Sequence, residues 1–141
     1  MSRTQQMMTT HPLVDGTPAQ DHTVLAAITA LNECAQACIS CADACLAEDD
    51  LPQLTACIRR NQDCADLCQI TATMLIRRGN TDPMLLQQVL LACRTASNAC
   101  AIECGKHDHQ HCAVCAEACK TAEQALTDLL QPPAVTPHRT L

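Results

Sequence analysis

The sequence predicts an all-α protein, an antiparallel up-down-up-down four-helix bundle with a cysteine-lined core. Helix formers dominate, whereas Phe, Tyr and Trp are absent and only three residues are Gly. Apolar residues and cysteines recur at alternating spacings of four and three in four separate stretches, which is the pattern of helices that share one core. A length of 141 residues suits a single domain.

Residues 1–20 are expected to form a mobile N-terminal tail, because His11-Pro12, Gly16 and Pro18 would interrupt a regular run. A short helix over Met7 and Met8 is compatible with this segment. The bundle itself is predicted to occupy residues 21–130. Its first helix should begin at Asp21, which suits an N-cap, and run to about Ala47 before the acidic stretch that follows.

The second helix is predicted to begin at Asp50, with Pro52 tolerated in its first turn. It should continue to Arg78, and Gly79 suits a left-handed C-cap. Thr81-Asp82-Pro83 should open the third helix, which Gly105 would close.

Asp108 is predicted to open the fourth helix. This helix should stop before Gln131-Pro132-Pro133, because proline cannot continue it. The remaining residues, 131–141, are expected to form a disordered C-terminal tail.

Every cysteine falls on the inner seam that the four-three alternation defines. Cys34 to Cys45 illustrates the pattern, with steps of four, three and four that keep the side chains on one helix face. Neighbouring Cβ atoms on such a face lie roughly 5 to 6 Å apart, which is beyond the usual separation within a disulfide. The thirteen cysteines are therefore candidate metal ligands: Cys34, Cys38, Cys41, Cys45, Cys57, Cys64, Cys68, Cys93, Cys100, Cys104, Cys112, Cys115 and Cys119.

The order of seam residues predicts which helix ends meet. The first and third stretches begin with apolar residues and end with cysteines, whereas the second and fourth do the reverse. The apolar ends therefore pack together, and the cysteine-rich ends pack together, only if neighbouring helices are antiparallel. One end should hold a hydrocarbon plug of Val24, Ile28, Leu75, Leu86, Leu90, Leu126 and Leu129. The other should be a mouth that carries Glu48, Asp49, Asp50, His107, His109 and His111, with Cys45, Cys57 and Cys104 just inside.

Clustered thiolates select soft metal ions, namely Cu(I), Zn(II) or iron in iron-sulfur clusters. Zinc prefers four ligands in a tetrahedral arrangement, which usually come from closely spaced pairs in loops. Cu(I) accepts two or three sulfur ligands, which the rows of cysteines on facing helices can supply. Each Cu(I) that displaces one thiol proton also leaves the buried core neutral. His107, His111 and the carbonyl oxygen of Asn61 are candidate additional ligands near the mouth. The other interpretation is that these histidines lie in a solvated turn and that the acidic residues cap helices.

These features resemble the bacterial copper storage proteins. The resemblance covers about residues 21–130 and rests on cysteine steps on all four helices, as in Cys34 to Cys45 and Cys112 to Cys119. It implies a tetramer of bundles, each filled with Cu(I) held by cysteine thiolates. The His107 to His111 region resembles the cytosolic branch, whose members tend to have more cysteines than this chain, in which Asn61, Thr71 and Ser97 occupy seam positions.

The predicted function is cytosolic copper storage and detoxification, without enzymatic activity, because no nucleophile with a base and an orienting group is evident. Multiple Cu(I) ions per chain would be exchanged with a cytosolic copper chaperone or a small thiol. A zinc or general heavy-metal sequestering protein is the alternative, and a thiol redox reservoir or iron-sulfur carrier is a weaker one.

The net charge of -6 disfavours nucleic acid as a partner, and no apolar run is expected to cross a membrane. An odd number of cysteines and a polar N-terminal segment favour a reducing cytoplasm.

Overall fold

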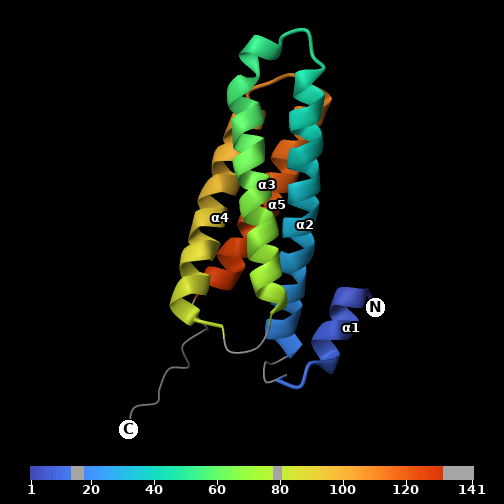
Figure 1. Cartoon of the computed structure of the whole chain (residues 1–141), viewed down its shortest axis with the longest axis vertical. Helices are drawn as coiled ribbons and strands as arrows, with labels where there is room; N and C mark the ends of the chain where they lie inside the picture. The colour runs from blue at the N-terminus through green and yellow to red at the C-terminus, as the bar shows by residue number, and fades with distance from the viewer. Residues whose placement is uncertain (14–17, 78–80, 132–141) are drawn as a thin grey trace.

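A computed structural model describes residues 1–13, 18–77 and 81–131 of the chain. Four long helices lie side by side, and a short fifth helix lies beside one end of the group (Figure 1). The elements in order are α1 (Arg3–Thr10), α2 (Pro18–Leu46), the 3₁₀ helix η1 (Leu51–Gln53), α3 (Thr55–Ile76), α4 (Pro83–Cys104) and α5 (Gln110–Leu130). The predicted all-α four-helix bundle is therefore confirmed.

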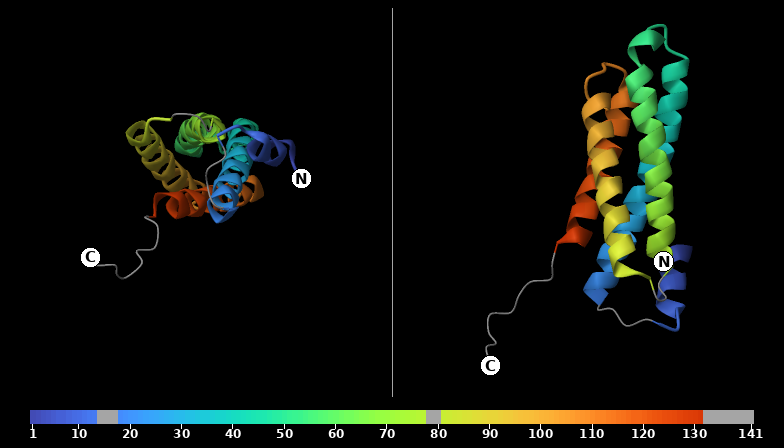
Figure 2. Two further views of the ribbon diagram at one scale, coloured as in Figure 1. Left: turned by 90° about the horizontal axis from the view of Figure 1, so that it is seen from below. Right: turned by 60° about the vertical axis from the view of Figure 1, so that its left-hand side comes forward.

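The bundle is antiparallel, with each long helix packed against two neighbours. Helix α2 packs against α3 and α5, and α4 packs against the same two helices. The turns from α2 to α3 and from α4 to α5 lie together at the upper end of Figure 1, and both remain at that end when the molecule is rotated (Figure 2). The predicted up-down-up-down order brings these two turns together, so their side chains form one end of the molecule.

The helix starts differ from the predictions at three places. Helix α2 begins at Pro18, whose missing N–H suits a first helical position, so Asp21 lies in the first turn and is not the N-cap. Asp50 precedes the 3₁₀ helix η1 and makes no side-chain capping bond. His109, not Asp108, occupies the N-cap of α5, also without a side-chain bond.

The remaining helix ends agree more closely with the predictions. Asp82 caps α4 by accepting hydrogen bonds from the backbone N–H groups of Met84 and Leu85. Gly105 follows the last residue of α4, in a right-handed conformation. Helix α3 ends at Ile76, slightly earlier than expected, and the predicted C-cap Gly79 lies outside the described residues.

The N-terminal segment contains the short helix that Met7 and Met8 allowed. Ser2 caps α1 by accepting a hydrogen bond from the N–H of Gln5, and Met8 is buried against the core. Helix α1 contacts α2 near the end of the bundle away from the two paired turns (Figure 1). The mobility expected for residues 1–20 stays a prediction, and the expected C-terminal tail beyond residue 131 lies outside the described part of the chain.

The hydrocarbon plug occupies the end of the bundle opposite the paired turns. Ile28, Leu75, Leu90 and Leu126 are buried in the core, and the outer members Val24, Leu86 and Leu129 pack against it while partly exposed. Leu31 and Ala122 continue the same apolar layer toward the cysteines. This end of the bundle therefore has the dry, close-packed core of an ordinary helical protein.

The residues Gln20–Leu46 of α2 are long and apolar enough to cross a membrane by length and composition, which the sequence reasoning did not anticipate. The core helix of a soluble protein passes the same test. Here the apolar face of α2 includes Ile28, Leu31 and four buried cysteines that pack against the other helices. Burial inside the bundle accounts for the apolar residues on this face of the helix, and a signal sequence near an N-terminus passes the same test of length and composition.

Candidate metal centre

All thirteen cysteines are free thiols, and all are buried in one contiguous core region. They come from α2, α3, α4 and α5, because the four-three spacing directs each helix's stripe inward. Where they neighbour one another, sulfur atoms typically lie 3.4 to 3.9 Å apart, as between Cys57 and Cys104 (3.4 Å) and between Cys34 and Cys38 (3.9 Å). The structure therefore places every predicted thiol inside the bundle.

Four groups of side chains have ligand atoms within 4.8 Å of one another and include thiols. They are Cys34, Cys38, Cys64 and Cys119; Cys38, Cys100, Cys115 and Cys119; Cys41, Cys104 and Cys115; and Cys41, Cys45, His111 and Cys112. Consecutive groups share at least one cysteine. Bridging thiolates of this kind suit several linked ions better than separate sites with ligands of their own.

Three further cysteines are linked to these groups by contacts with neighbouring thiols. Cys57 contacts Cys104, Cys68 contacts Cys64 at 3.9 Å, and Cys93 contacts Cys68 at 3.8 Å. Cys93 thus lies at the deepest end of the network, next to the hydrocarbon plug. The thiols form an unbroken series from the paired turns to the apolar layer.

Asn61 lies inside the thiol network and not on its rim. Its side chain is fully buried, and its carbonyl oxygen accepts hydrogen bonds from the thiols of Cys100 at 3.0 Å and Cys115 at 3.1 Å. The amide nitrogen donates to Cys57 at 3.7 Å. An oxygen surrounded by several sulfurs can serve as a supplementary ligand once those thiols lose their protons.

The other two polar seam residues have different partners. Thr71 is buried and donates its hydroxyl hydrogen bond to the backbone carbonyl of Leu67 at 2.7 Å. Ser97 is buried and accepts a hydrogen bond from the Cys64 thiol at 3.7 Å. Thr71 and Ser97 both also form side-chain hydrogen bonds with the thiol of Cys93, so both residues contact the thiol network.

The thiols nearest the paired turns differ in acidity. Burial raises the pKa of Cys45 to about 11, because the charged thiolate is poorly solvated there. Hydrogen bonds from Cys104, with smaller contributions from Cys57 and His111, lower the pKa of Cys41 to about 5. Of these two thiols, Cys41 therefore loses its proton more readily than Cys45.

His111 is positioned between the thiols and the surface. Its Nδ1 atom lies 3.4 Å from the sulfur of Cys41 and 3.6 Å from that of Cys112, while Nε2 lies 2.8 Å from Oε2 of Glu48. Partial burial alone would lower the pKa of His111, but the hydrogen bonds with Cys41 and Glu48 raise it above its ordinary value. His111 is thus the imidazole that the structure brings directly to the predicted sulfur ligands.

His107 is held differently from His111. Its Nε2 atom lies 2.8 Å from Oε2 of Glu103, one turn earlier on α4. This bond with His107 holds the pKa of the Glu103 carboxyl below its ordinary value. His107 therefore lies at the same end of the bundle, paired with a carboxylate.

The two turns are joined by a cluster of residues that the sequence places at the mouth of the bundle. Oε2 of Glu48 lies 3.0 Å from Nδ1 of His109, and the Asp50 carboxylate lies 2.9 Å from Nε2 of His109. The rings of His109 and His111 are stacked, with centroids 5.3 Å apart and planes 3° from parallel. The alternating pattern His-x-His at the start of α5 was the available signal, but the carboxylate partners come from a different turn.

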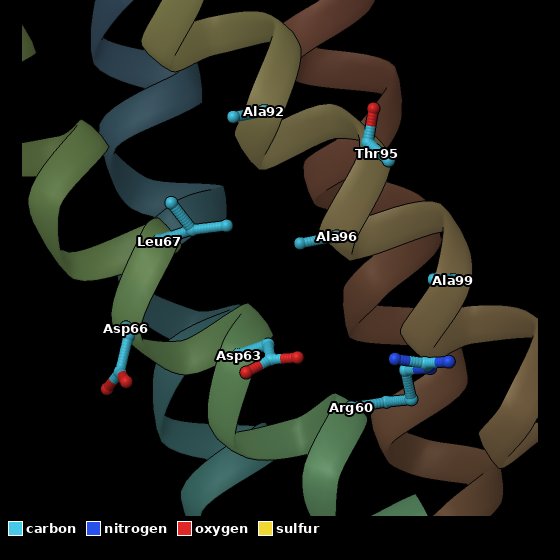
Figure 3. Close-up of a pocket in the computed structure, with 8 residues that line it drawn as sticks. All are labelled: Arg60, Asp63, Asp66, Leu67, Ala92, Thr95, Ala96 and Ala99. Carbon is cyan, nitrogen blue, oxygen red and sulfur yellow. The ribbon is translucent and has the colours of Figure 1, made fainter. Parts of the chain in front are cut away.

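A groove elsewhere on the bundle does not belong to this site. It lies between α3 and α4, has a volume of about 490 Å³ and contains no cysteine or histidine among its lining residues (Figure 3). Those residues are Arg60, Asp63, Asp66, Leu67, Ala92, Thr95, Ala96 and Ala99. This groove therefore contributes none of the sulfur ligands.

Comparison with known proteins identifies relatives of the same architecture. Ccsp from Streptomyces lividans, a copper storage protein in a structure loaded with 10 copper equivalents, is 43% identical, with a TM-score of 0.86 over 90% of this chain and 97% of that chain. The Cu(I)-bound copper storage protein BsCsp3 is 33% identical, with a TM-score of 0.70 over 77% of this chain and 99% of that chain.

A further relative is known from its sequence. The uncharacterized cysteine-rich protein YhjQ of Bacillus subtilis (strain 168) is 40% identical over 100 residues, which are 70% of this chain and 89% of that protein. The sequence profile described as "Csp: Copper storage protein" matches residues 20–131, which is nearly the whole of the four-helix bundle. With its thirteen buried thiols, this chain belongs to the copper storage protein family.

Proposed function

We propose that this protein is a store for Cu(I), which binds many copper ions inside the bundle through cysteine thiolates and performs no catalysis. The observation that carries this proposal is the continuous series of thiol groups that share ligands. Shared thiolates can bridge ions that accept two or three sulfurs, and one Cu(I) per thiolate keeps the core neutral. Its membership of a family of metal stores supports the same conclusion.

The proposed ligands are the thirteen cysteines, together with Asn61, His111 and His107. Asn61 contributes a carbonyl oxygen that already contacts three sulfurs of the network. His111 lies between Cys41 and the surface and would hand ions to the first thiolates. His107 would act as a transient ligand at the same end, after its imidazole separates from Glu103.

A titration of the reduced, metal-free protein with Cu(I) tests the proposal. The bound copper should reach about one ion per thiolate, with a few more if imidazole or oxygen ligands join. Saturation at three or four ions per chain would instead indicate independent tetrahedral sites and favour the zinc or general heavy-metal alternative. Direct competition between Cu(I) and Zn(II) for the same protein would then distinguish the two.

The proposed compartment is the cytoplasm. A Streptomyces lividans relative that is 45% identical, with a TM-score of 0.79, is described as a cytosolic copper storage protein. Copper would be exchanged with a cytosolic chaperone or a small thiol, since either can present Cu(I) on a soft ligand at the paired turns. Fractionation of cells that produce the full-length chain would test the location.

The proposed assembly is a homotetramer of bundles. Several large apolar side chains lie exposed on the outer faces of the helices, among them Ile39, Leu46, Ile70 and Ile102. Where such side chains form a contiguous patch, the patch often marks an interface with a partner. Light scattering of the purified protein should give a mass about four times that of one chain.

A further inference from the structure

The cluster that joins the two turns contains ligands of a different chemical class from the core. Glu48 lies in the turn that follows α2, whereas His109 is the N-cap of α5 and His111 lies in its first turn. One carboxylate oxygen and one nitrogen from each ring lie within 4.8 Å of one another. Imidazole and carboxylate suit divalent ions of borderline hardness, while the thiolates below suit Cu(I).

The distances within this cluster suit a tetragonal ion. Oε2 of Glu48 lies 2.8 Å from Nε2 of His111 and 3.0 Å from Nδ1 of His109. Two ligands at right angles around an ion with bonds of about 2.05 Å are separated by about 2.9 Å, whereas tetrahedral ligands would be about 3.3 Å apart. These values also match ordinary N–H to carboxylate hydrogen bonds, which a bound metal ion would replace.

The two rings are stacked, and a shared ion would require them to turn out of this parallel arrangement. His109 and His111 are parallel within 3°, and the side chains of all three residues are between 26% and 29% exposed. The cluster is therefore partly shielded yet open to ions from solvent. His111 has its Nε2 on this cluster and its Nδ1 facing Cys41, so the two nitrogens of one ring face two different ligand sets.

We infer that Glu48, His109 and His111 form a binding site for one divalent ion, with Cu(II) as the preferred metal, at the entrance to the thiol core. Cu(II) is favoured because it binds most tightly among the divalent first-row ions and adopts tetragonal geometry with nitrogen and oxygen ligands. Asp50 lies 2.9 Å from the other nitrogen of His109 and would orient that ring. This inference extends the proposed Cu(I) function, because it places a separate oxidised-copper site above the Cu(I) ligands.

The test uses the full chain, first loaded with Cu(I) under anaerobic conditions so that the thiols are occupied. Bound Cu(I) is measured, and one equivalent of Cu(II) is then added and followed by electron paramagnetic resonance, in which Cu(I) is silent. The expected result is one equivalent of axial Cu(II) whose spectrum shows nitrogen hyperfine splitting. His109→Ala and Glu48→Gln should each weaken Cu(II) binding at least tenfold while the Cu(I) content stays unchanged.

His22→Ala is the matched control, because His22 is an exposed imidazole on α2 outside this cluster. That variant should bind Cu(II) as the unmodified protein does. Equal Cu(II) binding in the His109 and Glu48 variants, or an equal loss in the His22 variant, would overturn the site and show that the cluster is only a hydrogen-bond network. The Cu(I) content measured first separates this failure from failure of the proposed store.

Discussion

The two halves of the bundle share the same helices and the same four-three spacing, but they differ in what their inner side chains can do. In the half below the cysteines, Ile28, Leu90 and Leu126 pack as ordinary core residues. In the other half, equally buried positions carry thiols that are small and nearly apolar while protonated. The comparison indicates that packing in the hydrocarbon half can stabilise the fold. The thiols of the other half can then bind metal without being needed to hold the helices together.

Removal of copper gives the largest expected contrast between the halves. Metal-free, reduced protein should remain mostly helical, because protonated thiols fill the upper core and the hydrocarbon plug is complete without metal. Loading with Cu(I) should then raise the melting temperature strongly, because many ions bind only the folded state. Circular dichroism of both forms measures the effect, and an unfolded metal-free chain would contradict this division of roles.

Truncation in the hydrocarbon half should reduce stability without reducing capacity. Leu126→Ala removes a fully buried side chain and should lower the free energy of unfolding of the metal-free protein by about 3 kcal/mol. The amount of Cu(I) bound at saturation should not change. Denaturant unfolding and copper quantification test both parts.

The matched variant carries Cys34→Ala and Cys68→Ala together in the sulfur half. It should bind fewer Cu(I) ions at saturation, with little change in the initial loading rate, because both thiols lie away from the paired turns. Loss of copper capacity in the Leu126 variant, when that variant is still folded, would mean that the halves are not separable.

Acid should slow copper loading through His111. The pKa of His111 is raised above its ordinary value of 6.5, so the protonated ring persists to higher pH than in an ordinary histidine. Only the neutral ring can bind metal, and the initial loading rate should therefore begin to fall above pH 6.5 as the solution is acidified. Stopped-flow transfer of Cu(I) from a chelator measures the rate.

His111→Ala provides the control for this pH dependence. The variant should load several-fold more slowly at pH 7.5, lose the component of the pH profile that belongs to His111, and retain nearly the same final capacity. An unchanged rate and profile would show that ions reach the thiols by another route.

The smallest expected effect concerns the pair of Glu103 and His107. Because the pKa of Glu103 is lowered, its contribution to stability is present above its ordinary pKa of 4.5 and is lost as the pH falls through the lowered value. Glu103→Gln should therefore reduce the stability of the metal-free protein by about 1 kcal/mol or less at pH 7. Thermal melts of both proteins at pH 7 and pH 3 should converge at the lower value.

The sequence was informative wherever helical periodicity determines the structure. Cysteine spacing predicted both the inward stripe and its burial, because a residue at a given step on a helix must share a face with its neighbours. Asp82 was also predicted correctly, since an aspartate followed by proline has few roles other than starting a helix. Helix starts at Pro18 and Gln110 were missed because several adjacent polar residues were equally suitable on local grounds.

The arrangement of the paired turns could not be predicted from the sequence. Glu48 and His109 are far apart in the chain, and their contact depends on how η1 and the α4–α5 turn are folded against each other. The contacts of Asn61 with Cys100 and Cys115 could not be predicted either, because they depend on how far three helices are shifted along one another. Helical periodicity predicts the face of the helix on which a residue lies. It does not predict which residues of a neighbouring helix lie opposite that residue.

The single apolar end of the core has a consequence for the order in which ions move. The thiol series runs from Cys41, beside the paired turns, to Cys93, beside the hydrocarbon plug. If ions pass from one thiolate to the next, an ion held near Cys93 can leave only after those nearer the turns have moved. Copper acquired most recently would then be released first, and the earliest ions would form a reserve that turns over slowly.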